Sequence, residues 1–189
     1  MKYTATINKE WLESHSSKYK VILADPPWTY NQKPRGNSDD EYSTMSLEQL
    51  AALPITAVAD TDCVLFMWAT FPLLPEAVYL MKEWGFLYKT GLSWHKKTRK
   101  GKDYFGNGFI FRSAAELLLV GYKGHPKPLN KSTRNSLDAV CLGHSIKPEA
   151  SYRLIEKLFE GPYLELFARR DRKGWNCVGN EVKDNTRLF

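Results

Sequence analysis

Short apolar runs alternate with helix-like segments along the chain, and this alternation restricts the possible folds more than any other feature. The first run, 19–24, is almost uninterrupted and stops at Asp25-Pro26-Pro27, as a buried parallel strand does when it ends in a loop. Further strands are predicted at 63–68, 86–94, 114–122 and 163–168. With the helices between them, these runs predict an α/β fold that has a mostly parallel sheet and helices on both faces.

Three segments have the apolar spacing of helices that would cover such a sheet. They are 46–53, 75–84 and 147–159. Ser46 stands where an N-cap is expected, and Gly85 and Gly161 follow the ends of the second and third helices. The segments 101–108 and 121–136 are predicted to be long loops, which in compact domains are often functional.

Length and composition place the chain in the ordinary globular class. Its 189 residues are 43% hydrophobic and 25% charged, so we expect a single domain over 1–189. The longest stretch with few charges, 63–81, is interrupted by two prolines and Glu76, which argues against a membrane span. The first residues lack the apolar run of a secretory signal. We therefore expect a cytoplasmic protein.

The cysteines and histidines do not form a metal-binding pattern. Cys63, Cys141 and Cys177 lie far apart, and none belongs to a CxxC pair or a Cys/His cluster. We expect free thiols and no metal.

Positive charge is concentrated in two segments that are predicted to be loops. The net charge is +6 and the pI is about 9.1. The segment 95–103 contains Lys96, Lys97, Arg99 and Lys100, and a second basic segment covers 123–134. Both could bind the phosphates of a nucleic acid, and both could equally be solvated faces.

Asp25-Pro26-Pro27-Trp28 carries the strongest chemical signal. The lone pair of an adenine amino nitrogen is delocalised into the ring, so the nitrogen attacks poorly unless its hydrogens are held. Asp25 can accept one N–H and the Pro26 carbonyl the other, while the two prolines fix the direction of these acceptors. Trp28 can stack on an extruded base. The alternative is an ordinary strand-to-turn segment with an exposed Asp25 and a core Trp28.

Several further motifs occur in a fixed order after this one. They are YSTMS at 42–46, LFMW at 65–68, WGF at 84–86, GNGFIFR at 106–112 with Glu116, HSIKP at 144–148, ELFAR at 165–169, and GW at 174–175 followed by GNE at 179–181. With DPPW, the segment 19–181 resembles the MTA-type adenine N6-methyltransferases. This family includes the catalytic subunit of the eukaryotic messenger-RNA adenosine methyltransferase and bacterial and phage relatives.

The resemblance implies a Rossmann-like class I methyltransferase fold in circularly permuted order and S-adenosyl-L-methionine as cofactor. The permutation would place the catalytic motif near the N-terminus, and no GxGxxG follows an early strand. The implied cofactor residues are Asp25, Lys147, which would pair with the cofactor carboxylate, and Arg169, Asn180 and Glu181, which would hold its ribose and adenosine end. Without the resemblance, Lys147 would be a surface lysine that enters a helix, and the other three matched residues near the C-terminus would be turn residues.

Substrate contacts are expected from the loops around this site. The resemblance places Tyr42 and Met45 in a loop that closes over the target base, although a capping role before the 46–53 helix is an equal alternative. Asn107 and Arg112 would contact the substrate beside the basic segment, or Asn107 would simply belong to a glycine-rich turn. Glu116, within an apolar strand, could be a buried carboxylate of purely structural use.

These observations predict an S-adenosyl-L-methionine-dependent methyltransferase that modifies the N6 amine of a flipped-out adenine in nucleic acid, with DNA preferred. RNA is the main alternative substrate. Two further hypotheses are a catalytically silent nucleic-acid-binding partner and a small-molecule amine methyltransferase. The sequence leaves open whether a homo- or hetero-oligomer completes the nucleic-acid surface.

Overall fold

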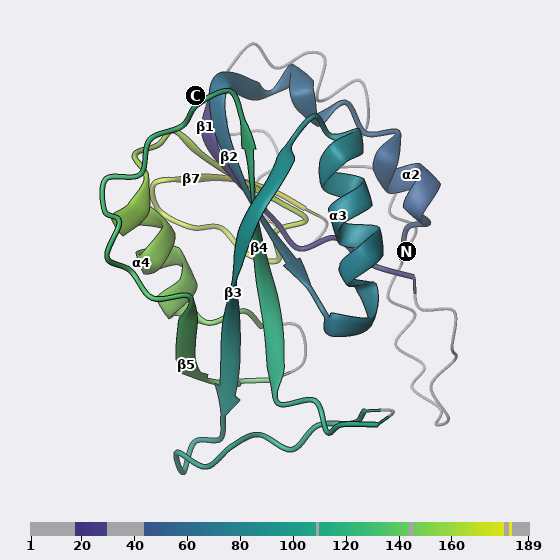
Figure 1. The fold of residues 1–189 in the computed structure, drawn as a ribbon, viewed down its shortest axis with the longest axis vertical. Coiled ribbons are helices and arrows are strands. Elements are labelled where there is room, and N and C mark those ends of the chain that lie inside the picture. The colour runs from purple at the N-terminus through teal and green to yellow at the C-terminus, as the bar shows by residue number, and fades with distance from the viewer. Residues whose placement is uncertain (1–17, 30–43, 109, 144–145, 180–181, 183–189) are drawn as a thin grey trace.

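One seven-stranded sheet runs through the described part of the molecule (Figure 1). The computed structural model describes residues 18–29, 44–108, 110–143, 146–179 and 182. The strand order is β5-β3-β4-β2-β1-β6-β7. The strands are β1 (Tyr19–Ala24), β2 (Ala59–Ala69), β3 (Leu87–Lys97), β4 (Ala115–Lys123), β5 (Ser136–Val140), β6 (Tyr163–Leu166) and β7 (Trp175–Val178). The helices are α2 (Leu47–Ala51), α3 (Leu74–Glu83), α4 (Glu149–Leu158) and the short 3₁₀ turns η1 (Ile55–Ala57) and η2 (Phe71–Leu73).

The sheet is mostly parallel, as predicted. β1 runs parallel to β2 and β6, β6 runs parallel to β7, and β3 runs parallel to β5. Only β4 is antiparallel to its neighbours β2 and β3, so six of the seven strands share one direction. Their carboxyl ends therefore meet at a single edge of the sheet, where open α/β folds bind their ligands.

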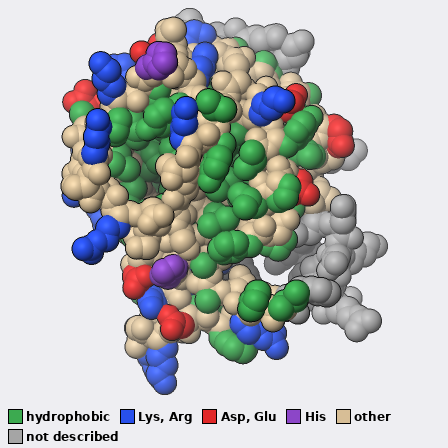
Figure 2. Space-filling model, in the orientation of Figure 1, with side chains coloured by type: hydrophobic (Ala, Val, Ile, Leu, Met, Phe, Trp, Pro, Cys, Tyr) green, Lys and Arg blue, Asp and Glu red, His purple; other side chains and the backbone are tan. Residues whose placement is uncertain are grey.

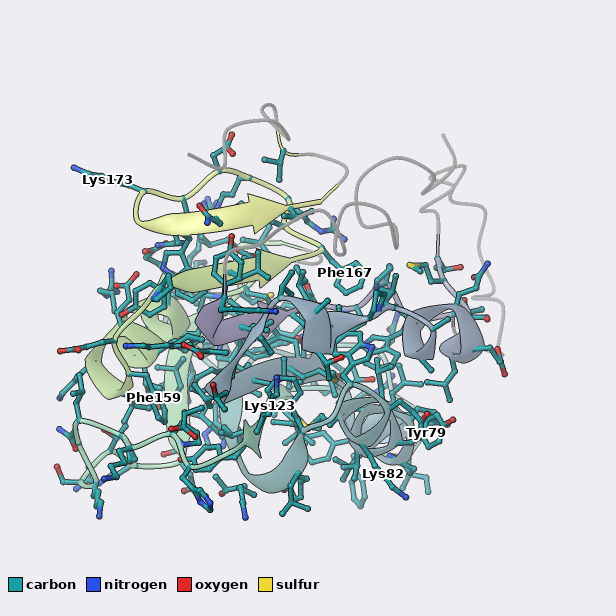
Figure 3. The ribbon with its side chains drawn as sticks, turned by 90° about the horizontal axis from the view of Figure 1, so that it is seen from above. Tyr79, Lys82, Lys123, Phe159, Phe167 and Lys173 are labelled. Carbon is teal, nitrogen blue, oxygen red and sulfur yellow. The ribbon has the colours of Figure 1, made fainter. Side chains whose placement is uncertain are left out.

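Helices cover both faces of the sheet, which confirms the predicted layers. One core cluster joins β1 and β2 to α2 and α3, and the indole N–H of Trp84 donates to the carbonyl of Leu50 at 2.8 Å. The second cluster joins the other face to α4, where the rings of Phe66 and Phe159 meet edge to face at 6.0 Å. Figure 3, seen from above, shows the sheet between these helices.

The predicted elements are present, and two strands were missed. β1 has the predicted bounds, and Ser46 caps α2 through a capping box with Gln49. The loop predicted over 121–136 is wrong at both ends, because β4 continues to Lys123 and β5 begins at Ser136. β5 and β7 are short edge strands, too brief to give a clear periodic signal.

The thiols of all three cysteines are free, as predicted. Within the described part of the chain, no helix is long and apolar enough to cross a membrane. In the same part, no cluster of three His, Cys, Asp or Glu side chains could hold a metal ion.

Candidate active site

The Asp25-Pro26-Pro27-Trp28 segment turns sharply away from the carboxyl end of β1. The N–H of Asp25 donates to the carbonyl of Leu166 at the end of β6, and the N–H of Trp28 donates to the carbonyl of Pro26 at 2.9 Å. The Pro27 carbonyl accepts the N–H of Met45 at 2.9 Å. These bonds and the fixed φ angles of the prolines hold the turn, so the Asp25 carboxylate has a defined position.

A cavity of about 360 Å³ opens at this edge of the sheet. Its wall includes all four residues of the motif, the ends of β2, β3 and β6, the beginning of β4, and the segment that precedes α4. The volume lies within the range typical of small-molecule sites. The predicted catalytic residues therefore line a cavity large enough for a single base and part of a cofactor.

Four charged side chains form a chain inside the cavity. The ammonium of Lys147 lies 3.0 Å from Oδ1 of Asp25 and 3.2 Å from Oε2 of Glu116, whose Oε1 lies 2.5 Å from Nζ of Lys96. The side chains of Lys96, Glu116 and Lys147 are only 12% to 15% exposed. We call these four residues the charged cluster. Its positive and negative charges balance, which such burial requires.

The opposite charges of the cluster stabilise one another, and this shifts the pKa values of Glu116 and Lys147. Burial alone would raise the pKa of the Glu116 carboxyl, but the ammonium groups of Lys147 and Lys96 outweigh it and lower that pKa. Burial would likewise lower the pKa of Lys147, but Asp25 and Glu116 outweigh it and raise that pKa. Lys147 therefore remains a cation at neutral pH, next to the carboxylate of Asp25.

Aromatic rings form much of the remaining wall. Trp28, Trp68, Trp94 and Tyr104 line the cavity, and the indole N–H of Trp28 donates to the carbonyl of Trp68 at 3.4 Å. The ammonium of Lys147 lies 5.4 Å from the centre of the Trp68 ring. Trp28 also packs against the core, as the structural alternative expects, and its stacking on a base stays a prediction. A flat base and a cation can both bind such a wall.

The two lysines at the end of β3 point in opposite directions, because successive side chains of a strand alternate. Lys96 enters the cavity and joins the charged cluster. Lys97 instead pairs with Asp103 at 2.7 Å. The prediction of a loop over the whole of 95–103 is therefore wrong for its first three residues, which belong to β3. Contact of these lysines with nucleic acid stays a prediction.

The other predicted substrate residues between β3 and β4 differ in position. Asn107 lines the cavity. Arg112 is exposed, and its guanidinium carbon lies 5.2 Å from the ring centre of Phe105. Arg99 and Lys100 are exposed in the turn that follows β3. All four lie on the carboxyl side of the sheet, and their predicted roles are compatible with these positions. Tyr42, Asn180 and Glu181 lie outside the described residues.

The second basic segment, 123–134, does not belong to this site. Lys123 ends β4 and pairs with Cys63 in the first half of β2, and its ammonium donates to the carbonyl of Ala59, the first residue of β2, at 3.1 Å. The segment thus begins at the opposite edge of the sheet from Asp25. Contact of this segment with phosphates stays a prediction, and such a contact would lie away from the catalytic motif.

Glu116 has partners that the sequence did not reveal. The sequence allowed a buried carboxylate of structural use at this position, and Glu116 is buried at the centre of the charged cluster, between Lys96 and Lys147. The structure explains the contact with Lys96, because Glu116 pairs in register with Trp94, and Lys96 follows Trp94 on the same face of β3.

A family model named MT-A70 matches residues 19–181. The chain belongs to the MT-A70 family. This MT-A70 protein is 33% identical to the type II methyltransferase M.MunI of Mycoplasma sp, over 89% of the chain and 79% of that relative. It is 31% identical to an N(6)-adenosine-methyltransferase MT-A70-like protein of Drosophila melanogaster and 29% identical to the N(6)-adenine-specific methyltransferase METTL4 of Homo sapiens. It spans only 28% and 39% of these two longer proteins.

Family membership confirms several predictions together. MT-A70 proteins are N6-adenine methyltransferases with a class I methyltransferase-like fold, and S-adenosyl-L-methionine is their methyl donor. The enzyme class, the chemistry and the cofactor inferred from the sequence are therefore correct.

The residues of the cavity fit this cofactor. A lysine ammonium has three hydrogen-bond donors, and the contacts of Lys147 with Asp25 and Glu116 leave one for a carboxylate. The Asp25 carboxylate and the Trp68 face suit a sulfonium cation. Arg169 and Phe167 extend the wall beyond β6.

Proposed function

We propose that this MT-A70 protein methylates the N6 amine of adenine in DNA. The observation that carries the proposal is the Asp25 carboxylate, held by Lys147 at 3.0 Å in a cavity with aromatic walls, beside the Pro26 carbonyl. The site therefore offers two acceptors for amino hydrogens and flat surfaces for a base. The organisation of the chain as a single domain over 1–189 is part of the proposal.

The chain's own residues prepare the amine for attack. Asp25 accepts one amino hydrogen and the carbonyl of Pro26 accepts the other, which turns the nitrogen lone pair out of conjugation with the ring. The Pro26 carbonyl already accepts the N–H of Trp28 at 2.9 Å, and its second lone pair is left for an amino hydrogen of the base. Trp28 stacks on the ring and fixes its plane. The new N–C bond would form as the S–CH3 bond of the sulfonium breaks with its electron pair going to sulfur, S-adenosyl-homocysteine would leave, and the nitrogen would give up one proton in the direction of Asp25.

The cofactor side of the cavity supplies charge and position. S-adenosyl-L-methionine, when bound, supplies the activated methyl group. Lys147 would hold the cofactor carboxylate, and Arg169, Asn180 and Glu181 would hold the ribose and adenosine end. Because Lys147 also contacts Asp25, one ammonium group would align the cofactor with the acceptor of the amine.

The comparison of lengths favours DNA over RNA as the substrate. The chain and the type II methyltransferase match over most of both proteins, 89% and 79%. The adenosine methyltransferase of Drosophila melanogaster is matched over only 28% of its length. As a class, type II methyltransferases modify DNA. The exposed basic residues Arg99, Lys100 and Arg112 beside the cavity suit a phosphate backbone.

The test is transfer of a labelled methyl group from S-adenosyl-L-methionine to DNA and RNA oligomers of matched sequence. We expect N6-methyladenine in DNA, and at least about a 100-fold loss in Asp25→Asn, which keeps the shape but weakens the acceptor. Lys89→Gln, an exposed lysine of β3, is the control for general effects of charge.

Either of two outcomes would contradict the proposal. Transfer to RNA alone would show that the substrate is RNA and would place the protein with the adenosine methyltransferases. Binding of cofactor and DNA without any transfer would favour a catalytically silent partner or a missing second subunit.

A further inference from the structure

The segment between β3 and β4 forms an arm that leaves the body of the molecule beside the cavity (Figure 1). Two backbone hydrogen bonds hold its base. The N–H of Tyr104 donates to the carbonyl of Lys96 at 2.9 Å, and the N–H of Gly106 donates to the carbonyl of Ser113 at 3.1 Å. Gly106, Asn107 and Ser113 line the cavity. The base of the arm is thus part of the proposed active site.

The tip of the arm is a tight turn that presents apolar side chains to solvent. A Cβ on Gly108 would lie 1.8 Å from the carbonyl oxygen of Phe111, so only glycine permits this close approach. Ile110 is 79% exposed, Phe111 is 85% exposed and Phe105 is 76% exposed. These are the three most exposed large hydrophobic side chains in the described part of the chain. Exposed apolar groups gathered in one place usually mark a binding surface.

The charges around the tip identify the kind of partner. Arg112 lies over the ring of Phe105, and Arg99, Lys100 and Lys102 are exposed in the turn at the end of β3. Figure 2 shows hydrophobic and basic side chains next to one another on this arm. Basic groups around an apolar tip complement a polymer that has phosphates outside and stacked bases inside.

A base that enters the cavity must first leave a duplex. Asp25 lies in the wall of the cavity. An adenine that is stacked and paired within a duplex can reach Asp25 only if it is extruded, at a cost of a few kcal/mol of unpairing and unstacking. Proteins commonly offset such costs with Phe, Ile or Leu wedges that replace the lost stacking. A wedge must be joined to the pocket that receives the base, and the base of this arm lines that pocket through Gly106, Asn107 and Ser113.

We infer that Ile110 and Phe111 form a wedge that enters duplex DNA and fills the space left by the extruded adenine. Arg112 and the basic turn hold the flanking phosphates. This inference rests on the proposed function, because it assigns the step that delivers the substrate to the same site. It makes the arm responsible for access to paired adenine and leaves the methyl transfer itself to the charged cluster and the DPPW turn.

The test compares Phe111→Ala and Ile110→Ala with Leu87→Ala, which removes a 65%-exposed side chain at the opposite edge of the sheet. Three DNA substrates share one sequence: a paired duplex, a duplex with a mismatch at the target adenine, and a single strand. We expect kcat/KM on the paired duplex to fall by about tenfold or more in the wedge variants, from the loss of one stacking contact. The loss should be smaller with the mismatch and absent with the single strand.

A second measurement does not depend on catalysis. With 2-aminopurine at the target position, the wild-type protein should raise the fluorescence of the duplex, and the wedge variants should raise it much less. If the wild type methylates no DNA, the proposed function fails, and this measurement still decides the inference.

Three results would overturn the wedge. The first is an equal loss on all three substrates, and the second is no loss on the paired duplex. The third is a change from dimer to monomer in the wedge variants by light scattering, which would make the tip an interface between copies of the chain.

Discussion

Glu116→Gln should destabilise the protein far more than its mild chemistry suggests. The Glu116 carboxylate binds two ammonium groups, Lys96 at 2.5 Å and Lys147 at 3.2 Å, and its side chain is 15% exposed. The wild-type charged cluster is neutral, whereas the variant leaves two buried cations with the single carboxylate of Asp25. Removing one partner of a buried ion pair costs about 3 to 5 kcal/mol. Residual exposure of the cluster places this case near 3 kcal/mol, which for a chain of this length lowers Tm by about 6 to 12 °C.

Urea unfolding provides the assay, and Asp103→Asn provides the matched control. Asp103 binds Lys97 at 2.7 Å, a similar distance, but its side chain is 80% exposed, so its loss should have a much smaller effect. The double variant Glu116→Gln with Lys96→Met restores neutrality and should regain part of the lost stability. Equal effects of Glu116→Gln and Asp103→Asn would show that the cluster is effectively solvated and would refute the reasoning.

The dependence on pH gives a second check on the same variant. The pKa of Glu116 is lowered in the folded protein, so its contribution to stability is present above the ordinary value of 4.5 and is lost as pH falls through the folded pKa. The penalty of Glu116→Gln should therefore be constant near neutral pH and should shrink in acid.

Three other predictions concern single groups. Lys147→Met should weaken binding of S-adenosyl-homocysteine by about tenfold or more in calorimetry, with Lys147→Arg retaining part of the affinity; unchanged binding would remove Lys147 from the cofactor site. Burial raises the pKa of the Glu165 carboxyl, so its contribution to stability is lost as pH rises through that pKa, and Glu165→Gln should flatten this decline in urea titrations. Burial raises the pKa of the Cys63 and Cys177 thiols to about 12, so maleimide should label the half-buried Cys141 first. Because Cys141 lines the cavity, S-adenosyl-homocysteine should protect Cys141 from this labelling.

Local patterns predicted those parts of the fold that depend on neighbouring residues. The apolar run that forms β1 and the Ser46 cap of α2 are properties of a few consecutive residues, and both match the structure. β5 alternates exposed and half-buried residues over only five positions, and its pairing with β3 depends on residues far away in sequence. Such an edge strand forms because it can pair with a neighbouring strand. That neighbour lies outside any short stretch of sequence from which the strand could be predicted.

The candidate site divides in the same way. The DPPW turn is local, and its chemistry could be derived from four consecutive residues. The charged cluster joins β1, β3, β4 and the segment before α4, so its members meet only in the folded protein. The net charge could not distinguish Lys96 from Lys100, because composition counts both lysines equally. In the structure, Lys96 is buried beside a carboxylate and Lys100 is exposed in a turn.

The neighbour relation between β1 and β6 has a consequence for how the chain matures. β1 leaves the ribosome well before β6, yet the two strands pair directly within the sheet. A growing chain can pair β1 with β2 early, but the other side of β1 stays unpaired until β6 has been synthesised. Pairings between such distant segments form slowly, and exposed strand edges invite aggregation in the meantime. The surroundings of Asp25 are therefore complete only after β6 has been synthesised, because the Asp25 N–H donates to the carbonyl of Leu166 at the end of that strand. A growing chain that has not reached β6 would carry the catalytic motif without a functional site.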